Sequence, residues 1–137
     1  MTVDETQAPG GILALLVEAV HERVLALPAC DRGDYVGSAL SAVNRALARI
    51  QAEGLASGPL FCEWGSGVGG VCAVAALNGF TPVGIEIRAE LVDAARSIAK
   101  QFDFPMVFAE GTFMFPGDED LAAATTHTRL SFDRHAW

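Results

Sequence analysis

The feature that most limits the possible folds is a run of glycines between two apolar segments. Residues 63–70 read Glu-Trp-Gly-Ser-Gly-Val-Gly-Gly, after the apolar residues 60–62 and at the start of the apolar stretch 69–78. A turn this sharp needs positive φ, and a ligand approaches a backbone closely only where no Cβ intrudes. The first N–H groups of the following helix lack helical partners and can bind an anionic or carboxylate group. The run therefore predicts a strand, a ligand-binding glycine turn and a helix.

The same alternation continues along the chain. Apolar runs predict strands at residues 60–62, 82–87 and 106–109, separated by helices at 69–78 and about 89–102. Strands that alternate with helices indicate right-handed crossovers and a parallel sheet. We therefore expect a Rossmann-like α/β fold of three α/β/α layers, with a short, truncated parallel sheet.

Two helices are expected before the first strand. Apolar residues recur at three- and four-residue intervals over residues 11–27, and Pro28 ends that helix. A loop over residues 30–34 leads to a second helix from about Val36 to Ala52. Gly54 follows as its left-handed cap. The chain accordingly divides into an N-terminal helical extension, residues 1–58, and a partial cofactor-binding domain, residues 59–137.

The C-terminal part has weaker signals. Pro116-Gly117-Asp118 is typical of a turn, residues 118–124 suit one short helix, and residues 129–137 have no clear period. Residues 130–133 suit the lead-in to a fourth strand.

Composition narrows the function classes. A hydrophobic fraction of 51% argues against disorder, and a net charge of −8 argues against general nucleic-acid binding. Charged residues interrupt the apolar stretch 11–27, so we predict no membrane span. The polar, acidic residues 1–10 do not resemble a secretory signal, so we expect a cytoplasmic protein.

The three cysteines suggest neither a metal site nor a redox pair. Cys30, Cys62 and Cys72 lack the spacing of a zinc site. We expect Cys62 in its strand and Cys72 in its helix to be small buried apolar residues in a reducing compartment.

A carboxylate near the end of the second predicted strand is the second feature of the site. Glu86 stands 21 positions after Gly65 (86 minus 65). At that place a carboxylate can accept hydrogen bonds from both ribose hydroxyls of an adenosine group. Together, the glycine turn and Glu86 predict a site for an adenosine-containing cofactor.

Two cofactor classes fit the glycines. Read as GxGxxG, with Gly65, Gly67 and Gly70, they indicate NAD or FAD. Read as ExGxGxG, they also include Glu63 and Gly69. A carboxylate beside a pyrophosphate would be repulsive, whereas it attracts the ammonium and sulfonium of S-adenosylmethionine. Glu63 therefore favours the cationic cofactor, the alternative being a buried carboxylate that caps nearby N–H groups.

These residues resemble the class I, Rossmann-like S-adenosylmethionine-dependent methyltransferases. Residues 63–69 are similar to the first motif of that family, and residues 84–87 with 90–96 are similar to its second strand and helix. The resemblance implies Glu63, Gly65 and Gly67 on the methionine side, Glu86 on the ribose and Ile87 against the adenine. At the end of the third strand, where the family often has Gly-Asp, Thr112 replaces the acid. The cofactor-binding residues that we predict are Glu63, Gly65, Ser66, Gly67, Gly69, Glu86, Ile87, Gly111 and Thr112.

The chain departs from the family in length. The family's sheet has seven strands, whereas three can be placed here, and 24 residues follow Phe113 (137 minus 113). In the family the first strand is central and has the fourth strand beside it. Without that fourth strand, the first strand exposes a hydrogen-bonding edge. We expect the tail or a second copy of the chain to cover this edge, or the chain to be part of something longer.

The activity therefore stays open between three hypotheses. The chain is a methyltransferase domain for an unknown acceptor, a non-catalytic S-adenosylmethionine-binding module, or an NAD-type nucleotide-binding domain, which Glu63 disfavours. Methyl transfer mainly requires donor and acceptor to be placed in line, so no catalytic residue is assigned.

Overall fold

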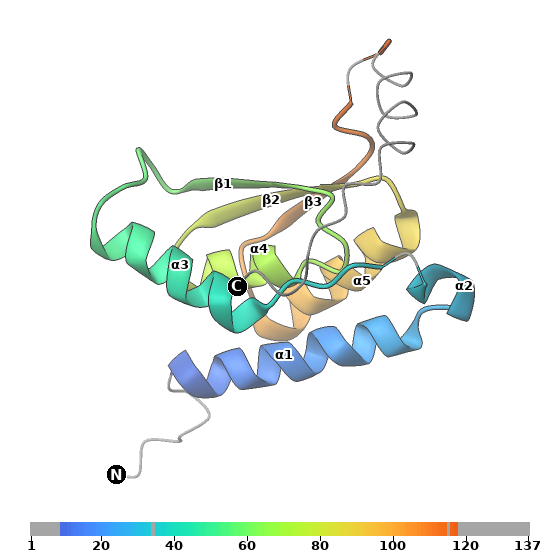
Figure 1. Cartoon of the computed structure of the whole chain (residues 1–137), viewed down its shortest axis with the longest axis horizontal. Helices are drawn as coiled ribbons and strands as arrows, with labels where there is room; N and C mark the ends of the chain where they lie inside the picture. The colour runs from blue at the N-terminus through green and yellow to red at the C-terminus, as the bar shows by residue number, and fades with distance from the viewer. Residues whose placement is uncertain (1–8, 34, 115, 118–137) are drawn as a thin grey trace, which may run out of the picture.

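A computed structural model describes residues 9–33, 35–114 and 116–117 (Figure 1). The short helix predicted at 118–124 and the segment 129–137 lie outside the described residues, as does most of the acidic N-terminal segment.

A parallel sheet of three strands forms the centre of the described fold. The strands are β1 (Leu60–Trp64), β2 (Thr81–Glu86) and β3 (Val107–Glu110), and they lie side by side in that order. Cys62 is opposite Val83 in one pair, and Gly84 is opposite Phe108 in the other. The predicted α/β fold with a short parallel sheet is confirmed.

Two helices make the crossovers between these strands. Helix α4 (Gly70–Leu77) joins β1 to β2, and α5 (Ala89–Phe102) joins β2 to β3. In α5 the buried residues recur with helical spacing, and this is why its bounds agree with the prediction: Leu91, Val92, Ala95 and Ile98.

Three helices precede the sheet. They are α1 (Pro9–Ala26), α2 (Ala29–Arg32) and α3 (Leu40–Ala52). The short α2 stands where we predicted a loop at residues 30–34. As predicted, α1 ends before Pro28 and Gly54 adopts a positive φ of 63° after α3.

The predicted start of the second helix at Val36 was wrong, because α3 begins at Leu40. Ala39 has a ψ of 86°, which is not helical, and Val36 is 90% exposed rather than part of the apolar stripe. Gly37 and Ser38, which lie between them, are weak helix formers. Residues 35–39 therefore lie outside α3 and form a linker that passes close to the glycine turn.

The helices all lie on one face of the sheet (Figure 1). One buried cluster joins residues from α1, α3, α4, α5 and β3, among them Leu16, Leu47, Cys72, Ile98 and Phe108. The predicted N-terminal extension thus shares a core with the predicted cofactor-binding domain. The opposite face carries no helix within the described ranges, so the described fold lacks the second helical layer of an α/β/α arrangement.

Strand alternation explains which residues are left on that open face. Phe61 and Glu63 point toward the helices, so Leu60, Cys62 and Trp64 point away and are exposed. The prediction that Cys62 is buried was therefore wrong, because the apolar run was taken for a strand covered on both faces. Cys72 is buried, as predicted.

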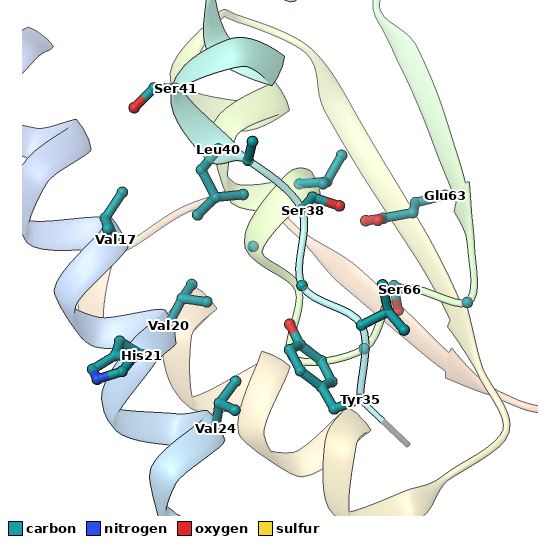
Figure 2. A pocket seen from close by; sticks show the side chains of 17 residues that line it. Val17, Val20, His21, Val24, Tyr35, Ser38, Leu40, Ser41, Glu63 and Ser66 are labelled. Carbon is teal, nitrogen blue, oxygen red and sulfur yellow. The ribbon is translucent and has the colours of Figure 1, made fainter. Parts of the chain in front are cut away.

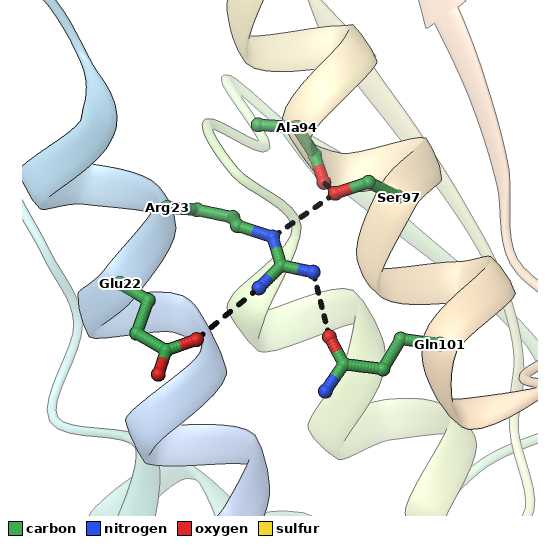
Figure 3. A network of polar contacts seen from close by, with 5 residues as sticks. All are labelled: Glu22, Arg23, Ala94, Ser97 and Gln101. Atoms are coloured by element: carbon green, nitrogen blue, oxygen red, sulfur yellow. Dashed lines mark hydrogen bonds and ion pairs between the residues drawn. The ribbon is translucent and has the colours of Figure 1, made fainter.

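A polar network attaches α1 to α5 (Figure 3). Arg23 donates from Nε to Ser97 Oγ at 3.1 Å and from Nη2 to the Gln101 side chain at 2.6 Å. Its third nitrogen pairs with Glu22 at 3.5 Å. These contacts hold α1 against α5, and α1 forms one wall of the site described below. No helix in the described parts of the chain has both the length and the apolar character needed to cross a bilayer.

Candidate functional site

The glycine turn between β1 and α4 is held against β2. Gly65, Gly67 and Gly69 have φ values of 70°, 53° and 80°, as the sharp turn requires. The N–H groups of Gly65 and Ser66 both donate to the carbonyl oxygen of Ile85, at 2.8 and 3.0 Å. The turn therefore lies at the carboxyl ends of two parallel strands, where open α/β sheets bind ligands.

Two of these glycines make room for different neighbours. A Cβ on Gly67 would lie 2.9 Å from Cε2 of Tyr35, a residue of the linker. A Cβ on Gly69 would lie 2.8 Å from the Phe108 ring and 2.9 Å from Ala95 Cβ. Gly69 thus serves the packing of the core, whereas Gly67 lets the linker approach the turn.

Glu86 fastens the turn from the end of β2. Its side chain is 7% exposed, and Oε2 accepts a hydrogen bond from the Gly67 N–H at 2.9 Å. Oε1 accepts a second bond from the Arg88 N–H at 3.0 Å. A carboxylate has about four lone-pair sites, so both oxygens can still accept bonds from a ligand.

The surroundings of Glu63 disfavour its charged form. Its carboxylate accepts a hydrogen bond from the Cys72 thiol at 3.2 Å. Burial raises the pKa of Glu63 to about 7, and the charge of Glu86 adds to this, while hydrogen bonds from Cys72 oppose it. None of the ion pairs among the described residues involves Glu63. Near neutral pH this side chain is therefore close to half protonated.

Two cavities open on the glycine turn. The first, of about 430 Å³, lies between the turn, α1 and the linker (Figure 2). Glu63 and Ser66 line it on the side of the sheet, and Val17, Val20 and Val24 line it on the side of α1. The volume is within the roughly 300–1,000 Å³ that small-molecule sites occupy.

The second cavity, of about 440 Å³, lies at the end of β2. Glu86, Arg88 and Leu91 belong to it alone. The two cavities share one wall, which consists of Tyr35, Val36, Gly65 and Gly67. The two cavities are therefore adjacent, and the candidate site that they make up has one carboxylate, Glu63, on one side and another, Glu86, on the other.

Five of the nine predicted cofactor residues line this candidate site: Glu63, Gly65, Ser66, Gly67 and Glu86. Gly69 lines neither cavity, and Ile87 lies outside both, with 67% of its surface exposed. Gly111 and Thr112 follow β3 and also lie outside both cavities. The Gly111 N–H nevertheless donates to the Glu86 carbonyl oxygen at 2.9 Å, so this segment adjoins the second cavity.

Ser66 is buried beneath β2. Its Oγ has no hydrogen-bond partner among the residues that the structure describes. A Cβ on Gly84 would lie 2.6 Å from this oxygen, so Gly84 is the residue that accommodates it. Ser66 therefore shapes the turn and offers one unpaired polar atom beside the first cavity.

Tyr35 is the site residue that the sequence reasoning missed. It is the one tyrosine of the chain and stands between the loop predicted at residues 30–34 and the helix predicted from Val36. Burial, Glu63 and Glu86, in that order, raise the pKa of its hydroxyl, so the phenol is neutral. The sequence signal that could have identified it is an aromatic residue between two glycines, Gly33 and Gly37. This pattern is typical of a loop whose ring packs against other parts of the chain.

The comparisons with known proteins concern the fold. No protein-family model matches the chain, and no curated protein sequence matches it significantly. A solved structure of monomeric WbdD is similar with a TM-score of 0.52 and 21% identity, over 75% of this chain and 27% of that chain. A second WbdD structure gives a TM-score of 0.50 and 22% identity, over 79% and 25%.

A chain from a study of the conversion of a disulfide bond into a thioacetal group during echinomycin biosynthesis is more distant. Its TM-score is 0.42 at 23% identity, over 48% of this chain and 27% of that chain. This chain spans about a quarter of the length of the solved chains it matches. At these identities the WbdD structures show a shared α/β arrangement.

Proposed function

We propose that the chain binds S-adenosylmethionine at the carboxyl ends of β1 and β2, as the cofactor-binding part of a methyltransferase-like domain. The methionine end would occupy the cavity beside Glu63, and the ribose would occupy the cavity beside Glu86. When bound, this cofactor supplies a methyl group activated by a sulfonium. The acceptor and the catalytic competence of the chain are left open.

The observation that carries the proposal is the position of Glu63. A half-buried carboxylate faces a cavity, and its nearest charged neighbour in the site is a second carboxylate, Glu86. An anionic group placed beside this pair would be repelled, and a cation would be stabilised. The ammonium and sulfonium of S-adenosylmethionine supply that positive charge.

The second cavity fits the adenosine part. Glu86 lies at the end of β2 with capacity for two ribose hydroxyls, and the glycines leave the backbone of the turn bare of side chains. The two cavities share a wall at the turn, and we propose that one elongated ligand occupies both. The fold shared with WbdD agrees with this proposal but does not identify the ligand.

Arg88 favours a second candidate, a dinucleotide such as NADP. It lines the second cavity two residues after Glu86, and an arginine there can accommodate a ribose phosphate. Its Nε, however, pairs with Glu90 at 2.6 Å, which lowers the charge that it offers to a ligand. Glu63 opposes a pyrophosphate, so we rank this candidate second.

Isothermal titration with S-adenosylmethionine, S-adenosylhomocysteine, NAD and NADP separates the candidates. We expect S-adenosylmethionine to bind and the dinucleotides to bind at least tenfold more weakly, about 1.4 kcal/mol. Glu86→Gln should weaken S-adenosylmethionine by about 1–3 kcal/mol, because charge-assisted bonds to the ribose are lost. It keeps one acceptor for the Gly67 N–H, so it disturbs the turn less than Glu86→Ala. Binding of NADP alone would reject the proposal.

A further inference from the structure

Tyr35 lies where the two cavities meet. It lines both of them, and its ring is the nearest side chain to the position that a Cβ on Gly67 would take, at 2.9 Å. Figure 2 shows the ring among the side chains that surround the first cavity, reached from the linker rather than from the sheet. The turn has no side chain at this point, so the ring provides the contact surface there.

Packing and a backbone hydrogen bond hold the Tyr35 ring in place. Tyr35 packs against a small buried cluster of Leu27, Val68 and Leu91, which come from the end of α1, the turn and α5. Its N–H also donates to the Arg32 carbonyl oxygen at 3.3 Å. An aromatic face fixed in this way loses little conformational freedom when a ligand arrives.

Two carboxylates act on the ring, whereas the cation that lines the second cavity, Arg88, is paired with Glu90. Glu63 and Glu86 both act on the Tyr35 hydroxyl, and they line the two cavities that the ring separates. The face of an aromatic ring is itself the negative end of its quadrupole. A cation at the shared wall would therefore be stabilised by the ring and by both carboxylates.

S-adenosylmethionine carries such a cation in its middle. The sulfonium joins the amino-acid part to the adenosine part, so a molecule that places these parts in the two cavities has the sulfonium at their shared wall. We propose that Tyr35 is a specificity-determining residue whose ring contacts the sulfonium and favours the cationic cofactor over S-adenosylhomocysteine, its neutral product. This inference rests on the proposed function, and it gives the site a physical reason to release product after methyl transfer.

The test compares two ligands on each variant by isothermal titration. We expect Tyr35→Leu to reduce the preference for S-adenosylmethionine over S-adenosylhomocysteine roughly 3- to 10-fold, which lies within the roughly 2- to 30-fold effect of a cation on an aromatic face. Tyr35→Phe keeps the ring and should keep the preference. Val36→Ala changes the other linker residue of the shared wall and should also keep it. A ratio measured on one variant does not depend on the fraction of that variant that is folded.

The outcomes separate this inference from the function on which it rests. Equal loss of both ligands in Tyr35→Leu would overturn it, because the ring would then serve packing alone. Loss of the preference in Tyr35→Phe would also overturn it, since the hydroxyl rather than the ring face would be the contact. Failure of the unaltered chain to bind either ligand would reject the proposed function itself.

Discussion

Glu63 is held where its charged form is disfavoured. Its pKa of about 7 in the folded chain lies above its ordinary value of 4.5, with burial as the main cause. The folded state therefore holds a proton between these two pH values that the unfolded state has released. The free energy of unfolding falls as the pH rises from about 4.5 to 7 and stays reduced above 7.

A Glu63→Gln variant should consequently be more stable than the unaltered chain at alkaline pH. We expect a gain on the order of 1 kcal/mol at pH 8, since partial exposure of the side chain screens part of the effect. Near pH 4.5 the two proteins should unfold at the same urea concentration. Urea unfolding at both pH values measures this. Equal stability at pH 8 would show that the carboxylate carries no such cost.

Binding should show the opposite dependence on the same group. A cationic cofactor prefers the ionised Glu63, so affinity should fall roughly tenfold between pH 8 and pH 6 as the carboxylate takes up a proton. Glu63→Gln should bind S-adenosylmethionine weakly and with little dependence on pH. Titrations at several pH values check both statements. A pH-independent affinity in the unaltered chain would remove Glu63 from contact with the ligand.

At the residue scale, the predictable positions are those that local chain geometry places. Glu63 lies near the end of β1, Gly67 follows that strand, and Glu86 ends the next one, so sequence spacing alone brought them to one edge of the sheet. Tyr35 reaches the turn through tertiary packing from a separate segment, and nothing in its local sequence specifies that contact. Cys62 was misplaced because the sequence does not reveal that, within residues 9–33, 35–114 and 116–117, one face of the sheet carries no helix.

Strand β2 contains a glycine, Gly84, whose surroundings are closely packed. A Cβ on Gly84 would lie 2.6 Å from the Phe108 ring and 2.6 Å from Ser66 Oγ, both of which are buried. The Phe108 ring and Ser66 Oγ therefore occupy the space that any larger residue at position 84 would need.

A Gly84→Ala substitution should destabilise the chain by about 1–3 kcal/mol, the usual cost of overpacking a buried site. Gly58→Ala is the matched control, because a Cβ there meets no atom within 4 Å. The control should change stability by less than about 0.5 kcal/mol. Thermal or urea unfolding compares the two variants. Equal effects at both positions would mean that β2 can shift away from Phe108.

The predicted bounds of a helix agree with the observed ones where its buried residues recur with a clear period. Helix α5 was predicted at its observed bounds, because its amphipathic stripe begins and ends sharply. The start of α3 was predicted four residues early (40 minus 36), because Val36 has the right spacing but not the burial. An apolar residue in a linker cannot be told from one in a helix by spacing alone.

For the described part of the molecule as a whole, the unusual features are the sheet face without helices and the unpaired edge of β1. Leu60 and Trp64 are exposed on β1, Val107 is exposed on β3, and Trp64 stacks on Phe113 at 5.5 Å. Within the described residues, β1 pairs on one side only. A strand edge with unpaired backbone groups beside apolar side chains is a template for another strand.

We therefore expect two copies of the chain to associate through the β1 edge. Cys62→Lys places a charge at the middle of this strand and should favour the monomer, whereas Val107→Lys on the β3 edge should leave association unchanged. Sedimentation velocity over a range of concentrations distinguishes the two variants. A strictly monomeric unaltered chain, with rapid amide exchange from residues 60–62, would contradict this expectation.

We propose that the glycine turn between Glu63 and Glu86 binds a cationic adenosine cofactor. Amide chemical shifts followed during titration with S-adenosylmethionine test this proposal. We expect concentration-dependent shifts at Gly65, Gly67 and Arg88, and smaller shifts with NAD at the same concentrations. Shifts confined to other parts of the chain, or equal responses of the turn to NAD, would contradict it.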